Sequence, residues 1–163
     1  MMHEITPFLW FDSEAEEAAN FYAGIFPNSS IGKVSRYDDA TAASVGRPVG
    51  SAMTVEFTLN GNPFVALNGG PMFKFTEAVS FAIRCQDQAE IDHYWERLTA
   101  DGGEESMCGW LKDKYGLSWQ VVPEQLIELN NAGGERARRA MSAVMTMRKI
   151  DIAVLLAAAE DEA

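Results

Sequence analysis

The sequence has 163 residues, of which 47% are hydrophobic and 10% aromatic, enough for the core of about one domain. Asp and Glu number 24 against 13 Lys and Arg, giving a formal net charge of -11. Such a surface repels phosphate backbones and anionic headgroups, so neither nucleic acid nor membrane is expected as a partner. The opening residues, MMHEITPFLWFD, hold no basic leader and no apolar run of bilayer length, which predicts a cytoplasmic protein.

The first part of the chain has the pattern of a strand, a helix and three further strands. Residues 5–11 are apolar and aromatic, and residues 12–26 repeat apolar side chains at helical spacing. Asp12 or Ser13 is expected to cap that helix, with Glu16 in the capping-box position. The strands expected next are 31–37 and, after a loop rich in Gly, Pro, Ser and Ala, 52–59. A further strand, 64–68, is expected across a turn formed by residues 60–63, Asn-Gly-Asn-Pro.

The same pattern then begins again. A strand at 78–85 leads into a helix at 87–103, capped by Asp87 with Glu90 and ended by a pair of glycines. Its buried face is expected to comprise Ile91, Tyr94, Trp95 and Leu98. Three more strands, at 105–108, 110–113 and 117–122, complete a second βαβββ unit and make an internal repeat.

The last two of these strands are expected to form a hairpin closed by Asp113 and Gly116. That closure would place Trp110 opposite Trp119 on one face and Leu111 opposite Ser118 on the other. We therefore expect both tryptophans to pack under the helices.

The remaining residues, 124–163, are helical in pattern. Their apolar stripe must pack against this chain's own sheet or a partner's; it comprises Ala137, Ala140, Met141, Val144 and Met145. Cys85 and Cys108 form no CxxC motif and are expected to be buried small hydrophobic side chains without activated thiols.

Two tandem βαβββ units resemble the vicinal-oxygen-chelate superfamily, the glyoxalase and bleomycin-resistance fold. Within it the chain resembles the PhnB-like family, also described as 3-demethylubiquinone-9 3-methyltransferase-like. The resemblance implies an α+β fold with curled, antiparallel-rich sheets around a cavity. It predicts one domain over residues 1–163, with units at about 4–70 and 77–123 and a helical tail at 124–163. The segments that carry it are ITPFLWFD, AEEAANFYAGIFPNS, LNGNPFVALNGGP, VSFAIRCQDQAEIDHYWERLTADGG, CGWLKDKYGLSWQVVP and AMSAVMTMRKIDIAVLLAA.

Metal-dependent members of the superfamily carry His and Glu ligands on the first and last strand of each unit. The resemblance places those positions here at Thr6 or Pro7, Ser80, Ala66 or Asn68, and Gln120. None of these offers the imidazole or carboxylate that a divalent ion prefers. The only histidines, His3 and His93, form no paired-ligand motif, so neither a metal nor another cofactor is expected.

The side chains expected on the concave faces make a neutral, polar and aromatic wall. Glu56 is the only carboxylate within a predicted strand of the first unit, and it either faces solvent or joins this wall. Such a lining suits a small organic molecule. The predicted ligand-binding residues are Phe64, Asn68, Ser80, Arg84, Ser118, Gln120 and Glu56.

These features predict a metal-free homodimer that binds a small hydrophobic or aromatic ligand. The alternative is an enzyme of the same superfamily, either a metal-dependent lyase, isomerase or dioxygenase or the methyltransferase that the family description names. The Gly-rich turn of Rossmann-type S-adenosylmethionine sites is missing from the sequence. A third hypothesis is an interaction surface formed by the tail residues Met141, Met145 and Met147, because methionine adapts to varied partners.

Overall fold

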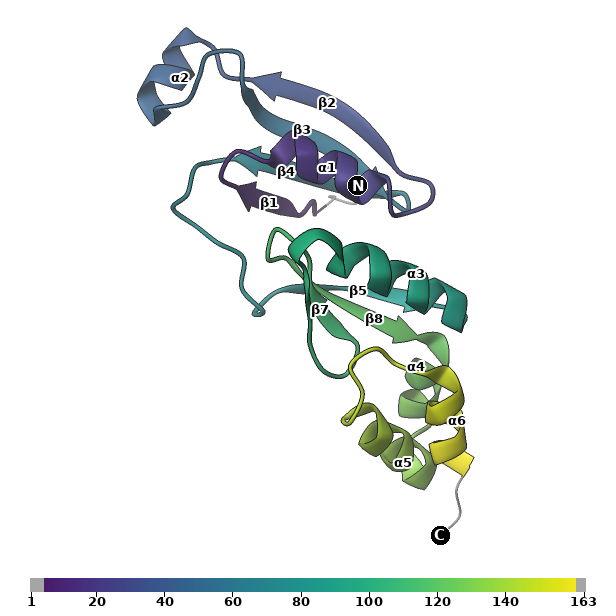
Figure 1. Ribbon diagram of the computed structural model, residues 1–163. Coiled ribbons are helices and arrows are strands. Elements are labelled where there is room, and N and C mark those ends of the chain that lie inside the picture. Colours follow the sequence, from purple (N-terminus) through teal and green to yellow (C-terminus); the bar gives the residue numbers. More distant parts are fainter. Residues whose placement is uncertain (1–4, 161–163) are drawn as a thin grey trace. The chain divides into compact units, whose positions relative to one another are not determined.

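The computed structural model describes residues 5–160 and separates into two compact units, Met1–Lys74 and Phe75–Ala163 (Figure 1). Each unit holds one four-stranded mixed sheet with a helix on one face, and the chain is α+β. The boundary falls between the two predicted repeats, so the repeat is confirmed. The prediction that both units act as one domain stays a prediction.

Unit one contains β1 (Phe8–Phe11), α1 (Ala15–Ala23), β2 (Ser30–Arg36), α2 (Asp39–Val45), β3 (Ala52–Leu59) and β4 (Asn62–Asn68). The strand order is β1-β4-β3-β2, with β1 parallel to β4 and the other neighbours antiparallel. Asn60 and Gly61 both have positive φ, 48° and 78°, and form a two-residue turn between β3 and β4. The turn is shorter than expected, and β4 begins at Asn62.

Helix α2 lies in the segment that was expected to be a loop between the second and third strands. It begins at a capping box, in which Asp38 Oδ1 accepts a hydrogen bond from the Thr41 N–H at 2.8 Å and the Asp38 N–H donates to Thr41 Oγ1. Gly46, with φ 69°, ends it in the left-handed conformation.

The core of unit one lies between α1 and the sheet. Tyr22 is fully buried on α1 and stacks on Phe57 of β3, with ring centroids 6.3 Å apart. Phe57 in turn stacks on Phe64 of β4 at 5.5 Å. These contacts identify the helix-covered face of the sheet; the opposite face is called the open face of unit one below.

The expected cap of α1 is wrong. Neither Asp12 nor Ser13 caps the helix, and the residue before it, Glu14, makes no side-chain cap hydrogen bond. Asn68 Oδ1, at the end of β4, accepts the hydrogen bond from the Ala15 N–H instead, at 2.8 Å.

Unit two repeats the topology with β5 (Ser80–Cys85), α3 (Gln88–Thr99), a short 3-10 turn (Ala100–Gly102), β6 (Glu104–Glu105), β7 (Trp110–Lys112) and β8 (Ser118–Pro123). The order β5-β8-β7-β6 matches that of unit one, and β5 is parallel to β8. Asp87 caps α3 by accepting from the Glu90 N–H at 2.9 Å, as expected. The predicted apolar face of α3 is buried.

The predicted register of the last hairpin is wrong by one residue. Trp110 pairs with Gln120 and Leu111 pairs with Trp119. The loop has three residues because Gly116 adopts the left-handed conformation, φ 85°, and the Asp113 N–H reaches the Leu117 carbonyl. Trp110 therefore lies on the face opposite Leu111 and Trp119.

The tail forms α4 (Glu124–Ala132), α5 (Gly134–Val144) and α6 (Ile152–Glu160). Ala137, Ala140 and Val144 of the expected apolar stripe are buried, whereas Met141 and Met145 are exposed. The tail packs within its own unit around a buried cluster of Leu126, Ala140, Val144, Ile150, Leu155 and Ala159. Gln88 of α3 holds the segment before α6, because its amide donates to the Ile150 carbonyl at 3.2 Å and accepts from the Ile152 N–H at 2.9 Å. Within residues 5–160, no helix is long and apolar enough to span a membrane.

Candidate functional site

A pocket of about 340 Å³ opens on the sheet of unit one. All of its walls come from this unit: β1 with the residues before it, and strands β2, β3 and β4. The lining mixes one carboxylate and several hydroxyls with aromatic and aliphatic surface. The residues that line it are Thr6, Phe8, Ser30, Gly32, Glu56, Phe57, Thr58, Pro63, Phe64 and Val65.

Glu56 supplies the carboxylate of this pocket. It is exposed and pairs with Val65 of β4, one residue out of phase with Phe57, so it projects from the open face. Within residues 5–160 its carboxylate makes no hydrogen bond and no ion pair. Gly32 faces it from β2: a Cβ added to Gly32 would lie 3.3 Å from the Glu56 Cβ. The glycine therefore leaves the space that the pocket occupies.

Two hydroxyls and one aromatic ring line the pocket together with the carboxylate. Ser30 Oγ and Thr58 Oγ1, on paired positions of β2 and β3, are hydrogen-bonded to each other at 3.0 Å. Phe8 of β1 is 63% exposed, which is unusual for a phenyl ring in a sheet. The pocket thus offers an apolar surface beside oxygen acceptors.

The expectation that Phe64, Ala66 and Asn68 lie on the open face is wrong. The pairing of Phe64 with Phe57 places both on the face covered by α1, although Phe64 also contributes to the pocket lining. Asn68 is 6% exposed, and its amide also donates to the Ala52 carbonyl at 3.0 Å. Its position follows from the end of β4 meeting the start of α1, which no local sequence pattern shows.

Four of the predicted residues lie together on the sheet face of unit two that α3 leaves open. Ser80 pairs with Ser118, and Gln120 Nε2 donates to Ser80 Oγ at 2.9 Å. Ser118 is buried, and its Oγ has no hydrogen-bond partner within residues 5–160. Arg84 is exposed on the same face. The register change brings Trp110 to this wall, although it was expected to pack under the helices.

A second hollow of unit one, about 310 Å³, lies beside the start of α1 and includes Asn68. Its two guanidinium groups are already paired, Arg36 with Glu16 at 2.7 Å and Arg47 with Asp12 at 3.1 Å. These pairs neutralise the hollow, so it offers no net charge to a ligand.

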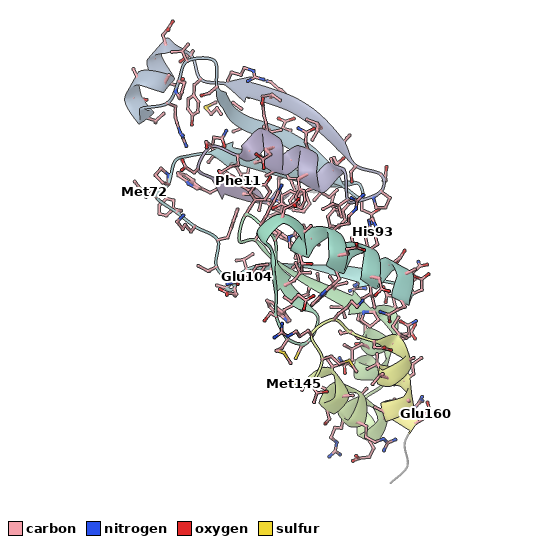
Figure 2. The ribbon with its side chains drawn as sticks, viewed as in Figure 1. Phe11, Met72, His93, Glu104, Met145 and Glu160 are labelled. Atoms are coloured by element: carbon pink, nitrogen blue, oxygen red, sulfur yellow. The ribbon has the colours of Figure 1, made fainter. Side chains whose placement is uncertain are left out.

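The donor groups do not suit a divalent metal. Across residues 5–160, His, Cys, Asp and Glu nowhere gather in a group of three that could hold an ion. Ser80 and Gln120, at two of the expected ligand positions, are neutral and bonded to each other. His93 lies on α3, with its ring against Tyr94 (Figure 2), and His3 lies outside the described residues.

The two cysteines differ in environment, and both are free. Burial, followed by the negative charges of Glu90 and Asp87, raises the pKa of the Cys85 thiol to about 12. Cys85 is therefore a poor nucleophile at neutral pH. Cys108 is only half-buried, contrary to expectation, with its Sγ 3.6 Å from Met145 Sδ.

Comparison with known proteins gives one family and a set of solved structures. Residues 3–122 match the family described as 3-demethylubiquinone-9 3-methyltransferase. A Bacillus cereus protein described as a putative 3-demethylubiquinone-9 3-methyltransferase, PhnB, is 37% identical, with a TM-score of 0.65 over 74% of this chain and 99% of that chain. No protein with a curated description matches.

More distant structures share the fold. A protein from Pseudomonas aeruginosa is 16% identical, with a TM-score of 0.59 over 75% of this chain and 98% of that one. A variant of the fosfomycin resistance protein FosX from Listeria monocytogenes, solved with Mn(II) and 1S,2S-dihydroxypropylphosphonic acid, is 19% identical, with a TM-score of 0.54 over 85% and 98% of the two chains. On the family match and the Bacillus cereus likeness, this chain belongs to the PhnB-like 3-demethylubiquinone-9 3-methyltransferase family, within the glyoxalase and bleomycin-resistance superfamily.

Proposed function

We propose that this chain binds a small hydrophobic or aromatic molecule in the pocket on the open face of unit one, without a metal ion. The observation that carries the proposal is the pocket itself, about 340 Å³ with a mostly apolar lining and a few oriented polar groups. This size and composition are typical of sites for small organic ligands. The protein is further proposed to work as a cytoplasmic homodimer.

Binding accounts for the lining better than catalysis does. General acid–base and nucleophilic mechanisms need a reactive group within hydrogen-bond reach of a second group that activates it. Among the lining residues, Glu56 has no such partner, and the Ser30 and Thr58 hydroxyls bond only each other. The site supplies shape and polarity, and no activated group.

The open face of unit two is proposed as a second, separate ligand-contacting surface within that unit. The Ser80 hydroxyl and the Gln120 amide are hydrogen-bonded to each other. The buried Ser118 hydroxyl has no hydrogen-bond partner among the described residues, so a ligand could supply one. Trp110 adds an aromatic edge to this face, and Arg84 adds a cation. On this face, by itself, these groups would bind a polar ligand through hydrogen bonds and charge.

Exposed apolar side chains support the homodimer. Met72 and Phe73 of unit one are 77% and 58% exposed, and Met72 is visible on the segment after β4 (Figure 2). Patches of this kind mark surfaces that a partner covers. Sedimentation velocity should give a dimer; a monomer at micromolar concentration would contradict this part of the proposal.

The ligand proposal is tested by a thermal-shift and calorimetry screen of small aromatic molecules against three proteins. Gly32→Val fills the space beside Glu56, whereas Ser35→Val enlarges a side chain of the same strand outside the pocket lining. Compounds that bind the wild type should bind the Ser35 variant equally and the Gly32 variant about tenfold more weakly. The absence of any binder, or equal binding to both variants, would overturn the proposal.

The same screen includes S-adenosylmethionine, because the family description names a methyltransferase. Saturable binding of this compound together with methyl transfer to a quinol acceptor would replace the binding function with an enzymatic one.

A further inference from the structure

We infer that the pocket of unit one selects a cationic aromatic ligand, with an amine or quaternary ammonium group attached to a ring. The inference rests on the proposed function and assigns the chemical class of its ligand. Of the ten residues that line the pocket, Glu56 alone carries a charge, and no lysine or arginine is among them.

In the described part of unit one, Glu56 forms no ion pair, whereas two other carboxylates do. Asp12 and Glu16 are each paired with an arginine, at 3.1 Å and 2.7 Å. Lys33 follows Gly32 on the neighbouring strand, yet no ion pair joins it to Glu56 in the described part of the chain. The pocket therefore keeps one negative charge uncompensated by the protein.

The groups around this charge suit a cation on an aromatic scaffold. The exposed ring of Phe8 can attract a cation through its face or stack on a ligand ring. The Ser30 and Thr58 oxygens offer further acceptors for N–H donors. The net charge of -11 adds a long-range attraction for cations.

Other charge classes fit the pocket less well. An anionic ligand would meet the Glu56 carboxylate with no cation in the lining to offset the repulsion. A neutral aromatic ligand would take water from that carboxylate without replacing its hydrogen bonds. A cationic ligand avoids the charge repulsion, and its ion pair with the carboxylate compensates for the lost water.

Three probes with one ring system test the inference: 1-naphthylmethylammonium, 1-naphthalenemethanol and 1-naphthoate. Dissociation constants are measured by fluorescence titration and calorimetry at low and high salt. The cation should bind the wild type about tenfold more tightly than the alcohol, with the preference shrinking at high salt, and naphthoate should bind most weakly. In Glu56→Gln the cation should lose its preference and bind like the alcohol, and the alcohol should bind at least as tightly as it does to the wild type.

Glu96→Gln removes a charge from the exposed side of α3 in unit two and serves as the matched control. It should leave all three dissociation constants unchanged. Equal binding of cation and alcohol to the wild type, both weakened by Gly32→Val, would overturn the charge assignment and leave the proposed function standing. Failure of all three probes to bind would count against both.

Discussion

Asn68 Oδ1 accepts a hydrogen bond from the Ala15 N–H at 2.8 Å, across 53 residues of sequence. The same amide donates to the Ala52 carbonyl, and the Asn68 carbonyl accepts from the Tyr37 hydroxyl at 2.7 Å. One buried residue thus caps α1 and ties it to the ends of β3 and β4.

Replacing Asn68 with alanine should destabilise unit one by about 2–3 kcal/mol, because a helix cap and a buried carbonyl both lose their partner. Asn68→Asp keeps the acceptor and loses the donor, so its loss should be intermediate. Urea unfolding followed by circular dichroism measures both. Unchanged stability in Asn68→Ala, combined with weaker ligand binding, would restore the sequence-based role of Asn68 in the ligand site.

Asp113 is the buried carboxylate of the last hairpin, 2% exposed. Its Oδ1 accepts from the Tyr115 and Leu117 N–H groups, and its Oδ2 accepts from Trp119 Nε1 at 2.9 Å. Asp113→Ala leaves these donors unsatisfied and should cost about 3 kcal/mol, with Asp113→Asn less harmful. Tryptophan fluorescence during urea unfolding reports the change. The exposed Glu96→Ala serves as the control, and an equal effect of the two alanine variants would contradict this role.

Gln88 should control the opening of the segment before α6. Gln88→Ala removes both amide hydrogen bonds to this segment, so tryptic cleavage after Arg148 and Lys149 should accelerate roughly tenfold. Mass spectrometry of the fragments over time gives the rate. Glu96→Ala, on the same helix, should cleave like the wild type. Equal rates in all three proteins would show that other contacts hold the segment.

The two thiols should differ in reactivity. At pH 8 one thiol per chain should react with a disulfide reagent, and that reaction should disappear in Cys108→Ala but persist in Cys85→Ala. In urea both thiols should react. The raised pKa of Cys85, from 9.0 to about 12, means that the unfolded thiol loses its proton first. This group's contribution to stability is therefore complete below pH 9 and declines as the pH rises toward 12.

Metal analysis of protein purified without chelators should give far less than one transition-metal ion per chain. The reason is the donor chemistry of Ser80 and Gln120, which are neutral and bonded to each other. A Ser80→His, Gln120→Glu variant places imidazole and carboxylate there and should bind more Mn²⁺ than the wild type. One ion per wild-type chain, removed by chelation with loss of ligand binding, would contradict the metal-free proposal.

Local patterns were enough to predict most of the fold. Strand β3 has the predicted bounds, Ala52–Leu59, and α3 begins at the predicted Asp87 cap. Helix α2 was missed although its signals are local, since Asp38, Thr41 and Gly46 mark both of its ends. Those residues were interpreted as a loop because the segment is short and rich in small side chains.

The candidate site was less predictable, because it depends on register and on distant contacts. One left-handed residue, Gly116, moved Trp110 to the other face of its sheet. The position of Asn68 required knowing that β4 ends beneath the start of α1. Ser80, Arg84, Ser118 and Gln120 do share one face, because the parallel pairing of β5 and β8 preserves the predicted alternation.

The strand order shared by both units also sets the sequence of events in folding. β2, β3 and β4 are joined to their neighbours by antiparallel pairings, and the turn at Asn60 and Gly61 lets β3 and β4 meet quickly. β1 pairs only with β4, the last strand of its unit to be synthesised. The first strand of each unit can therefore pair only after the fourth strand has formed. We expect these two parallel pairings to limit the folding rate, because they close the longest loops.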